Sequence, residues 1–130
     1  MNDNDLVILP PSELEVMTAV WEAERAYPKP VLTSHLYRIV PALERLDIST
    51  VISLLNRLVG KGFLRIEKLG RNNTYESLVP QETYRTRAVL EFIDRICGGD
   101  RVQMFARIVE SMTPEELAAL RGLLEERKKA

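Results

Sequence analysis

Cysteine and histidine are nearly absent from this chain of 130 residues, which has one of each, Cys97 and His35. A single cysteine excludes an internal disulfide and any metal cage built from thiolates. His35 has no partner for a catalytic or metal-binding role nearby in the sequence, so we expect it at the surface. The chain also lacks a Ser/His/Asp arrangement and the glycine patterns of nucleotide-binding loops. We therefore expect no enzyme, no catalytic residue, no bound metal and no cofactor.

Long apolar runs are missing as well, since none approaches the roughly 20 residues that span a bilayer. The N-terminal sequence Met-Asn-Asp-Asn-Asp is acidic and lacks the basic start of a secretory signal. We therefore expect a cytoplasmic protein that does not insert into a membrane. The chain is long enough for one compact domain, or for two small parts that share a core through oligomerisation.

The net charge of −1 conceals an uneven distribution. Residues 1–47 carry four cations and eight anions, residues 48–79 carry five cations and two anions, and residues 80–130 carry nine of each. The positive charge is therefore concentrated in the middle segment. Such clustering is typical of a nucleic-acid contact, whereas the weak overall charge predicts modest non-specific affinity and reliance on dimerisation.

The segment from Asp47 to Lys61 has the spacing of an amphipathic helix, with Asp47 placed to cap its first turn. One side is apolar, comprising Val51, Leu54, Leu55 and Leu58. The opposite side is rich in hydroxyl groups and ends in cations. Short polar side chains suit base edges, and Arg or Lys suits phosphate or guanine. The pattern fits a DNA-recognition helix, but it fits an ordinary solvated helix equally well, so the flanking sequence must decide.

Two further helices are expected before this segment. Ser12 and Glu15 have the spacing of a capping box at the start of the first helix, and Trp21 falls in its buried stripe. The second helix is expected to begin near Thr33 and to end or kink at Pro41, because proline removes an amide and clashes with the preceding turn.

A β-hairpin is expected after the segment. Apolar and charged residues alternate over 63–69 and 74–79, and the Gly-Arg-Asn-Asn sequence at 70–73 is typical of a turn. Three short helices and a basic hairpin form the pattern of a winged helix-turn-helix, and a solvated helix would not explain why the neighbouring hairpin is also basic. The candidate DNA contacts are Ser49, Thr50, Ile52, Ser53, Asn56, Arg57, Lys61, Arg65, Lys68 and Arg71.

Residues 81–130 show helical periodicity without strands. One helix is expected from Gln81 to Cys97, a second after the Gly98-Gly99 break, and a third after the Thr-Pro-Glu-Glu start signal at 113–116. Three separated helices of this length cannot readily close a core of their own. A homodimer would close it and would place two recognition helices about one DNA turn apart, matching a palindromic operator. The alternative is a monomer in which these helices fold back on the winged domain.

We therefore expect a mostly α-helical fold with a small β-hairpin wing. Residues 1–80 form a winged helix-turn-helix DNA-binding domain, and residues 81–130 form a three-helix dimerisation region. The candidate dimerisation residues are Tyr84, Ala88, Phe92, Ile93, Phe105, Ile108, Leu117, Leu120 and Leu124.

Several motifs together resemble a known family. They are Pro11–Met17 with Trp21, Ser49–Gly62 with its Thr-Val, Leu-Asn-Arg-Leu and Lys-Gly elements, Gly70-Arg71 with Tyr75, Gly98-Gly99, and Glu115–Leu124. They look like the motifs of the penicillinase-repressor family of winged-helix transcriptional regulators, and the resemblance covers roughly residues 10–127. It implies a homodimeric repressor of palindromic operators. It also implies base contacts from Ser49, Thr50, Ser53 and Asn56, and phosphate contacts from Arg57 and Lys61.

In antibiotic-sensing members of that family, a membrane sensor-protease signals a cell-wall antibiotic and the repressor is cleaved in the dimerisation region. The resemblance places the candidate cleavage bond near Arg107-Ile108, where the family typically has Asn-Phe. The copper-responsive branch carries a cluster of Cys-x-Cys motifs, so a chain with Cys97 alone is not expected to sense copper.

A second class of function fits the same pattern. Some winged helices bind proteins without sequence-specific recognition of DNA. In a protein-interaction module the apolar side chain of Ile52 would dominate binding, whereas in a DNA reader the cations would dominate and Ile52 would meet a thymine methyl group.

Overall fold

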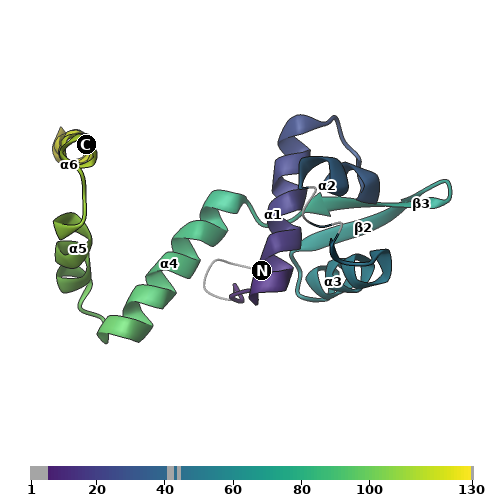
Figure 1. Ribbon diagram of the computed structural model, residues 1–130, viewed down its shortest axis with the longest axis horizontal. Helices are drawn as coiled ribbons and strands as arrows, with labels where there is room; N and C mark the ends of the chain where they lie inside the picture. Colours follow the sequence, from purple (N-terminus) through teal and green to yellow (C-terminus); the bar gives the residue numbers. More distant parts are fainter. Residues whose placement is uncertain (1–5, 41–42, 44, 130) are drawn as a thin grey trace. The chain divides into compact units, whose positions relative to one another are not determined.

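The computed structural model describes residues 6–40, 43 and 45–129, in which the chain forms six helices and three short strands (Figure 1). In chain order they are α1 (Pro11–Ala26), β1 (Val31–Leu32), α2 (Thr33–Ile39), α3 (Ile48–Gly60), β2 (Leu64–Leu69), β3 (Asn72–Ser77), α4 (Gln81–Cys97), α5 (Arg101–Glu110) and α6 (Pro114–Lys129). The mostly α-helical fold with a small β wing is thereby confirmed. Contacts group the chain into a first unit that extends to Ala88 and a second that starts at Val89. A domain boundary after residue 80 stays a prediction, because α4 contributes to both units.

The first unit is built on a three-stranded antiparallel sheet with the strand order β1-β3-β2. In the β2–β3 hairpin, Leu69 pairs with Asn72, so only Gly70 and Arg71 form the turn. Gly70 has φ +63°, a conformation that suits glycine at the first position of a two-residue hairpin turn. The predicted four-residue turn was therefore too long, and Asn72 and Asn73 belong to β3.

Strand β1 was not expected from the sequence. It has two residues, and Val31 pairs with Tyr75 while Leu32 pairs with Thr74. So short a strand has no periodicity of its own, and it exists because the hairpin offers β3 as a partner.

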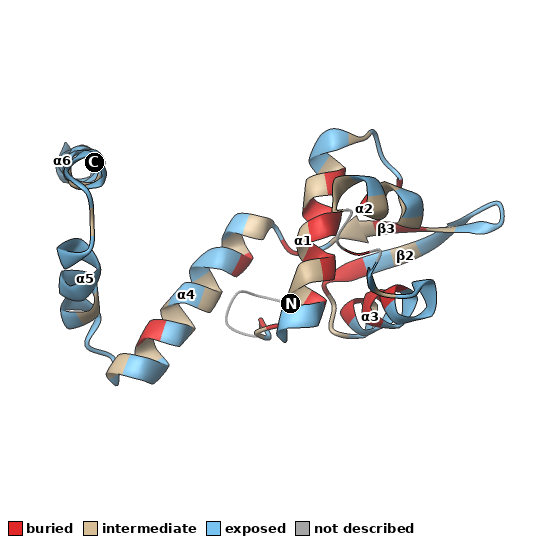
Figure 2. Cartoon of the chain, in the orientation of Figure 1, coloured by how far each residue is buried: buried red, intermediate tan, exposed pale blue. Residues whose placement is uncertain are grey.

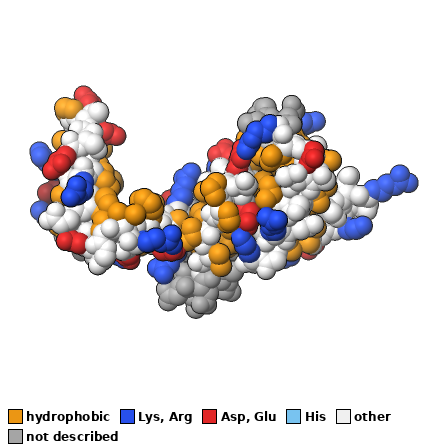
Figure 3. All heavy atoms as spheres, turned by 60° about the horizontal axis from the view of Figure 1, so that its bottom comes forward, with side chains coloured by type: hydrophobic (Ala, Val, Ile, Leu, Met, Phe, Trp, Pro, Cys, Tyr) orange, Lys and Arg blue, Asp and Glu red, His pale blue; other side chains and the backbone are white. Residues whose placement is uncertain are grey.

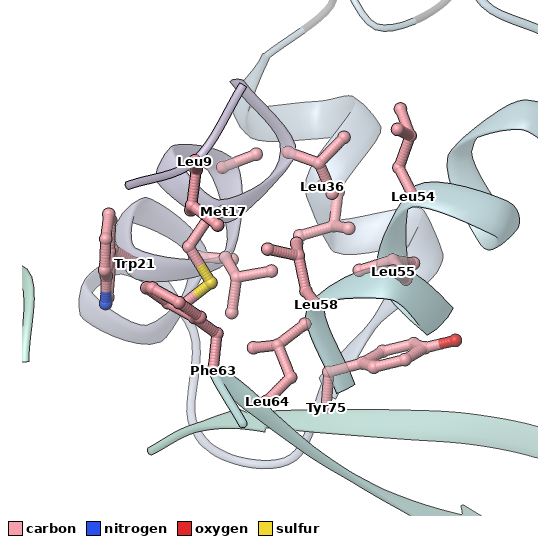
Figure 4. Packing of buried hydrophobic residues seen from close by; sticks show 14 of the residues in the cluster. Leu9, Met17, Trp21, Leu36, Leu54, Leu55, Leu58, Phe63, Leu64 and Tyr75 are labelled. Carbon is pink, nitrogen blue, oxygen red and sulfur yellow. The ribbon is translucent and has the colours of Figure 1, made fainter. Parts of the chain in front are cut away.

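The core of the first unit lies between helices α1, α2 and α3 and the sheet. Figure 4 shows side chains of the three helices converging on Phe63, Leu64 and Tyr75, which are fully or almost fully buried. Trp21 lies in this core as expected, and its Nε1 donates a hydrogen bond to the carbonyl oxygen of Val79 at 2.9 Å. This hydrogen bond joins α1 to the segment after β3, 58 residues later in the sequence.

The N-terminus of α1 differs from the prediction. The helix begins at Pro11 after Pro10, and no side chain caps it, so the Ser12–Glu15 capping box was wrong. Proline at the first helical position favours a helix start at Pro11, which makes Pro10 the capping residue, and the side chain of Pro10 has no acceptor. The Glu15 carboxylate instead binds Arg45, which lies thirty residues further along the chain.

The second helix ends at Ile39, near the predicted end, and Pro41 lies outside the described residues. His35 is half-buried, which corrects the expected surface position. Its ring stacks on Tyr27 with a centroid distance of 4.4 Å, and its Nδ1 accepts a hydrogen bond from the backbone N–H of Leu32 at 3.0 Å. The ring therefore holds the start of α2 rather than a ligand.

Helix α3 follows the prediction closely. The Asp47 carboxylate accepts a hydrogen bond from the backbone N–H of Thr50 at 3.0 Å, which satisfies a free amide at the helix start. The buried residues of the helix are Val51, Leu54, Leu55 and Leu58. These side chains pack toward α1 and the sheet, which leaves the opposite side of α3 in solvent.

Three helices separated by tight breaks make up the C-terminal part of the chain. Gly98 and Gly99 both have positive φ and end α4, and the predicted capping box starts α6. There the backbone N–H of Thr113 donates to Glu116 at 2.9 Å, and the N–H of Glu116 donates to the Thr113 hydroxyl at 3.1 Å. No helix among the described residues combines the length and the apolar character needed to cross a lipid bilayer.

Candidate nucleic-acid interface

The solvent side of α3 gathers most of the residues that the sequence singled out. Seven of its side chains are exposed, namely Ile48, Ser49, Thr50, Ile52, Ser53, Asn56 and Arg57. Figure 2 shows both buried and exposed stretches along α3. A shallow hollow on this side is lined by Ser49, Thr50, Ser53, Leu54 and Arg57. Because the apolar side of α3 is buried, these polar groups on its opposite side project together into solvent.

Two of these hydroxyl groups interact with the capping carboxylate. Ser49 and Thr50 both donate to Oδ1 of Asp47, which also accepts from the Thr50 amide. These hydrogen bonds, the Thr50 hydroxyl first among them, hold the pKa of Asp47 below its ordinary value. The carboxylate therefore stays ionised, while the hydroxyl oxygens of Ser49 and Thr50 keep lone pairs that can accept from a base amino group.

The wing differs between its base and its tip. At the base, Arg65 binds Glu76 at 2.5 Å, and Lys29 approaches the same carboxylate at 3.6 Å. The guanidinium of Arg65 lowers the pKa of Glu76, as expected for a carboxylate held in its charged form. At the tip, Lys68 and Arg71 are exposed and have no acidic partner among the described residues. Figure 3 shows Lys and Arg side chains forming the far end of this hairpin.

Lys61 and Arg57 also differ, although both lie at the C-terminal end of α3. Lys61 Nζ binds Oε1 of Glu13 at 2.5 Å, and the Glu13 side chain is only 5% exposed. Arg57 is exposed and has no acidic partner in the described part of the chain. The positive charge of Lys61 is thus neutralised within the protein, whereas that of Arg57 is available to a ligand.

Three exposed residues of the first unit were missed by sequence reasoning. Ile48 is the first residue of α3 and is 59% exposed, and Leu69 is 56% exposed beside the wing turn. Arg38 is exposed on α2 without an acidic partner among the described residues. It follows Ser34 by one helical turn, on the side away from the buried Leu36. That spacing was a usable signal, but Arg38 lies in the net-negative segment of residues 1–47, whereas the distribution of charge pointed to residues 48–79.

The predicted dimerisation residues divide into exposed and buried sets. Phe92 is 60% exposed and Phe105 is 48% exposed. Ile108 and Leu124 are also exposed, Ala88, Leu117 and Leu120 are half-buried, and Ile93 is buried. Neither α5 nor α6 has a buried residue. Figure 3 shows hydrophobic side chains on the surface of these helices.

Tyr84 belongs to the buried set, and its expected place at a dimer interface needs correction. Its side chain is 3% exposed in the core of the first unit. The hydroxyl oxygen accepts a hydrogen bond from the backbone N–H of Leu9 at 2.9 Å, and the ring contacts Trp21 and Phe63. A helical stripe counted from sequence cannot separate a residue that anchors the start of α4 from those further along it.

Comparison with known proteins gives a family match over nearly the whole chain. The penicillinase repressor family model matches residues 9–126. A protein of Latilactobacillus sakei, described as an uncharacterized 16.5 kDa protein in the ptsI 3' region, is 31% identical over 102 residues, which are 78% of this chain and 66% of that protein. The transcription regulator MarR from Oenococcus oeni PSU-1 aligns over 88% of this chain and 78% of its own, with 19% identity and a TM-score of 0.37, too distant for any inference. Because the family model covers nearly the whole chain, this protein belongs to the penicillinase repressor family, whose members are DNA-binding transcriptional regulators and not enzymes.

Proposed function

We propose that this chain is a homodimeric transcriptional repressor that binds a palindromic operator in duplex DNA. One observation supports this most strongly. The exposed hydroxyl and amide groups of α3 adjoin Arg57, and the wing adds Lys68 and Arg71, three cations without acidic partners among the described residues. A polar helix face flanked by available positive charge is what a major-groove reader requires.

The individual roles follow from side-chain chemistry. Ser49, Thr50, Ser53 and Asn56 are short enough to meet base edges when α3 enters the major groove. Ile52 is exposed on the same helix and suits a thymine methyl group. Arg57 would bind phosphate, and the wing tip would bind the backbone beside the groove. Phosphate contacts fix the register of the protein on the duplex, and the α3 side chains then select the sequence.

Selection from a randomised duplex library tests this function. The wild-type chain should enrich a sequence with two-fold symmetry, and binding to it should weaken as salt is raised. The variant Ser53→Ala should relax the enriched sequence at one base pair of each half-site while leaving the salt dependence unchanged. Enrichment of no sequence, together with salt-independent binding, would reject the proposal.

Dimerisation through the C-terminal helices is the second part of the proposal. The exposed apolar side chains of α4, α5 and α6 need a cover in water, and a second copy of the same helices supplies one of matching length. A dimer also doubles the number of phosphate contacts, which compensates for the few available cations in one chain.

Release by proteolysis in α5 is the third part, and it rests on membership of the family. Arg107 and Ile108 are exposed but lie inside the helix, so a protease must unwind α5 before the bond can enter its active site. We expect cells treated with a cell-wall antibiotic to accumulate a fragment that ends at Arg107. Immunoblots showing only the full-length chain under treatment, while the target genes are induced, would exclude this route.

A protein-interaction module is the alternative function, and the exposure of Ile48 and Ile52 one turn apart on α3 favours it. The two functions predict different duplex binding by the wild-type chain and its variants. For a DNA reader, Arg57→Gln should weaken duplex binding at least as much as Ile48→Ala combined with Ile52→Ala. For a protein-binding module, duplex binding should be negligible in all of them.

A further inference from the structure

Two carboxylates of α1 bind cations that flank α3. Glu13 binds Lys61 at 2.5 Å, and Lys61 directly follows the last residue of α3. Glu15 binds Arg45 through two hydrogen bonds, of 2.7 Å and 2.6 Å, and Arg45 precedes the capping residue Asp47 by two positions. One helix is therefore linked by ion pairs to both ends of the next helix in the candidate interface.

The apolar packing of α3 does not by itself define its orientation. Its buried side consists of four aliphatic side chains, and contacts between such groups are non-directional. They resist separation of α3 from α1 more strongly than a small rotation or slide along it. Hydrogen bonds between charged groups are short and directional, and the fork of Arg45 on Glu15 restricts the geometry further. The two ion pairs can therefore fix a position that the core leaves loosely defined.

The burial of Glu13 makes this ion pair a weak source of stability. Its side chain is 5% exposed, while that of Lys61 is 30% exposed. Removing a carboxylate from water is unfavourable, and an apolar residue at the same position often stabilises a protein as well as a buried ion pair does. Buried ion pairs are best attested as devices that specify one arrangement among several.

We propose that Glu13 and Glu15 are positioning residues that set the angle at which α3 meets DNA, acting through Lys61 and Arg45. This inference rests on the proposed DNA-binding function. It reassigns Lys61 from a phosphate contact to a structural partner of Glu13. Sequence selectivity should therefore depend on two acidic residues of α1, a helix that contributes no base contact.

The direction in which a substitution changes the affinity for DNA distinguishes positioning from general electrostatics. Replacing Glu15 by glutamine removes a negative charge from a protein that binds a polyanion, so electrostatics alone predicts tighter binding to every duplex. Positioning predicts weaker binding to the selected duplex, because the hydroxyl groups of α3 no longer meet the base edges together. Glu22→Gln is the matched control, since Glu22 also lies on α1 but binds Arg25 of the same helix.

The experiment measures dissociation constants for two probes. One is the duplex that the wild-type chain enriches from a randomised library, and the other is a scrambled duplex of the same length and composition. The selectivity is the dissociation constant for the scrambled duplex divided by that for the selected duplex. This ratio should fall about tenfold in Glu15→Gln, the scale of losing one well-placed base contact, and should stay unchanged in Glu22→Gln. Equal ratios in the two variants would overturn the proposal.

A double variant tests the buried pair without changing net charge. Glu13→Gln combined with Lys61→Met should lower the same ratio and leave the salt dependence of binding as in the wild type. A salt slope reduced by about two in the dimer would instead show that Lys61 binds phosphate, and would overturn its reassignment.

Thermal unfolding of each variant verifies folding. If the double variant is unfolded, Glu15→Gln carries the test, because the Glu15–Arg45 pair lies at the surface. If the wild-type chain enriches no duplex, the proposed function itself fails, which is a different outcome from equal ratios.

Discussion

The cations near α3 differ in whether an acidic side chain of the protein already neutralises their charge. Arg65 binds Glu76 and Lys61 binds Glu13, whereas Arg71 has no such partner among the described residues. Binding to DNA releases counterions only where a phosphate, rather than a protein carboxylate, takes up the positive charge. Cations of the same type and nearly the same sequence position are therefore unequal as ligands for a phosphate backbone.

Substitution of Arg71 tests this distinction. Arg71→Ala should weaken binding to selected and scrambled duplexes alike, and should reduce the slope of log K against log salt by about two in a dimer. Arg65→Ala serves as the control. The guanidinium of Arg65 is already paired with Glu76 at 2.5 Å, so this substitution should change the slope less. Equal changes of slope in fluorescence anisotropy titrations of both variants would contradict the assignment.

Protonation of Asp47 should destabilise the start of α3. Its pKa in the folded chain is lowered, chiefly by the hydrogen bond from the Thr50 hydroxyl. The stabilisation is therefore complete above the ordinary pKa of an aspartate, about 4, and is lost as the pH falls through the lower folded value. The melting temperature should drop more steeply with acidification in the wild type than in Asp47→Asn, which keeps a capping oxygen without a titrating charge. Parallel curves in circular dichroism melts would contradict this.

Among the elements, α3 is the one in which the capping and turn residues of the sequence agree with the packing of the helix. Asp47 caps it, its apolar period agrees with the buried residues, and Gly62 with φ +82° allows the chain to turn into β2. Local and tertiary preferences agree here, which is why periodicity alone predicted both the helix and its exposed side. The same agreement accounts for α6, where the capping box and the helix start coincide.

Other elements depend on partners that sequence patterns do not contain. Strand β1 forms because β3 lies beside it, and Glu15 leaves its expected cap because Arg45 is within reach. The pairing of Lys61 with Glu13 joins positions 48 residues apart, so a count of local charge assigned Lys61 to DNA. The helices, the hairpin and the exposed surface of α3 were therefore predictable, whereas the division of cations into paired and available ones was not.

Packing of α3 should be sensitive at Leu55, which is fully buried. Leu55→Ala should lower the free energy of unfolding by about 2–5 kcal/mol, because it leaves a cavity between α3 and the core. Ile52→Ala, on the exposed side of the same helix, should change it by no more than about 0.5 kcal/mol. Urea denaturation followed by circular dichroism measures both, and similar losses in the two variants would show that the buried side of α3 is misassigned.

At the scale of the whole molecule, the two units differ in how far their apolar side chains are buried. The first encloses its core, whereas α5 and α6 have no buried residue and leave Val102, Phe105 and Leu123 exposed. Helices this short are marginal in water without a packed face. This contrast supports the proposal that the C-terminal helices form the dimer and that the first unit binds DNA.

Charged residues on the apolar side of these helices should prevent assembly. Phe92→Asp combined with Phe105→Asp should give monomers in sedimentation and operator binding weakened by at least about a hundredfold, because each monomer makes half the phosphate contacts. Gln103→Glu adds charge to α5 without removing an apolar group and should remain dimeric. An unchanged dimer in the double variant would place the interface elsewhere.

The salt dependence of binding tests the central claim, that α3 and the wing tip bind duplex DNA through cations that no carboxylate neutralises. Arg57, Lys68 and Arg71 give six such cations in a dimer, so log K for the selected duplex should fall linearly with log salt with a slope of about −5. Participation of Lys61 and Arg65 would steepen the slope to about −9 and contradict the division into paired and available cations. A slope near zero would contradict DNA binding itself.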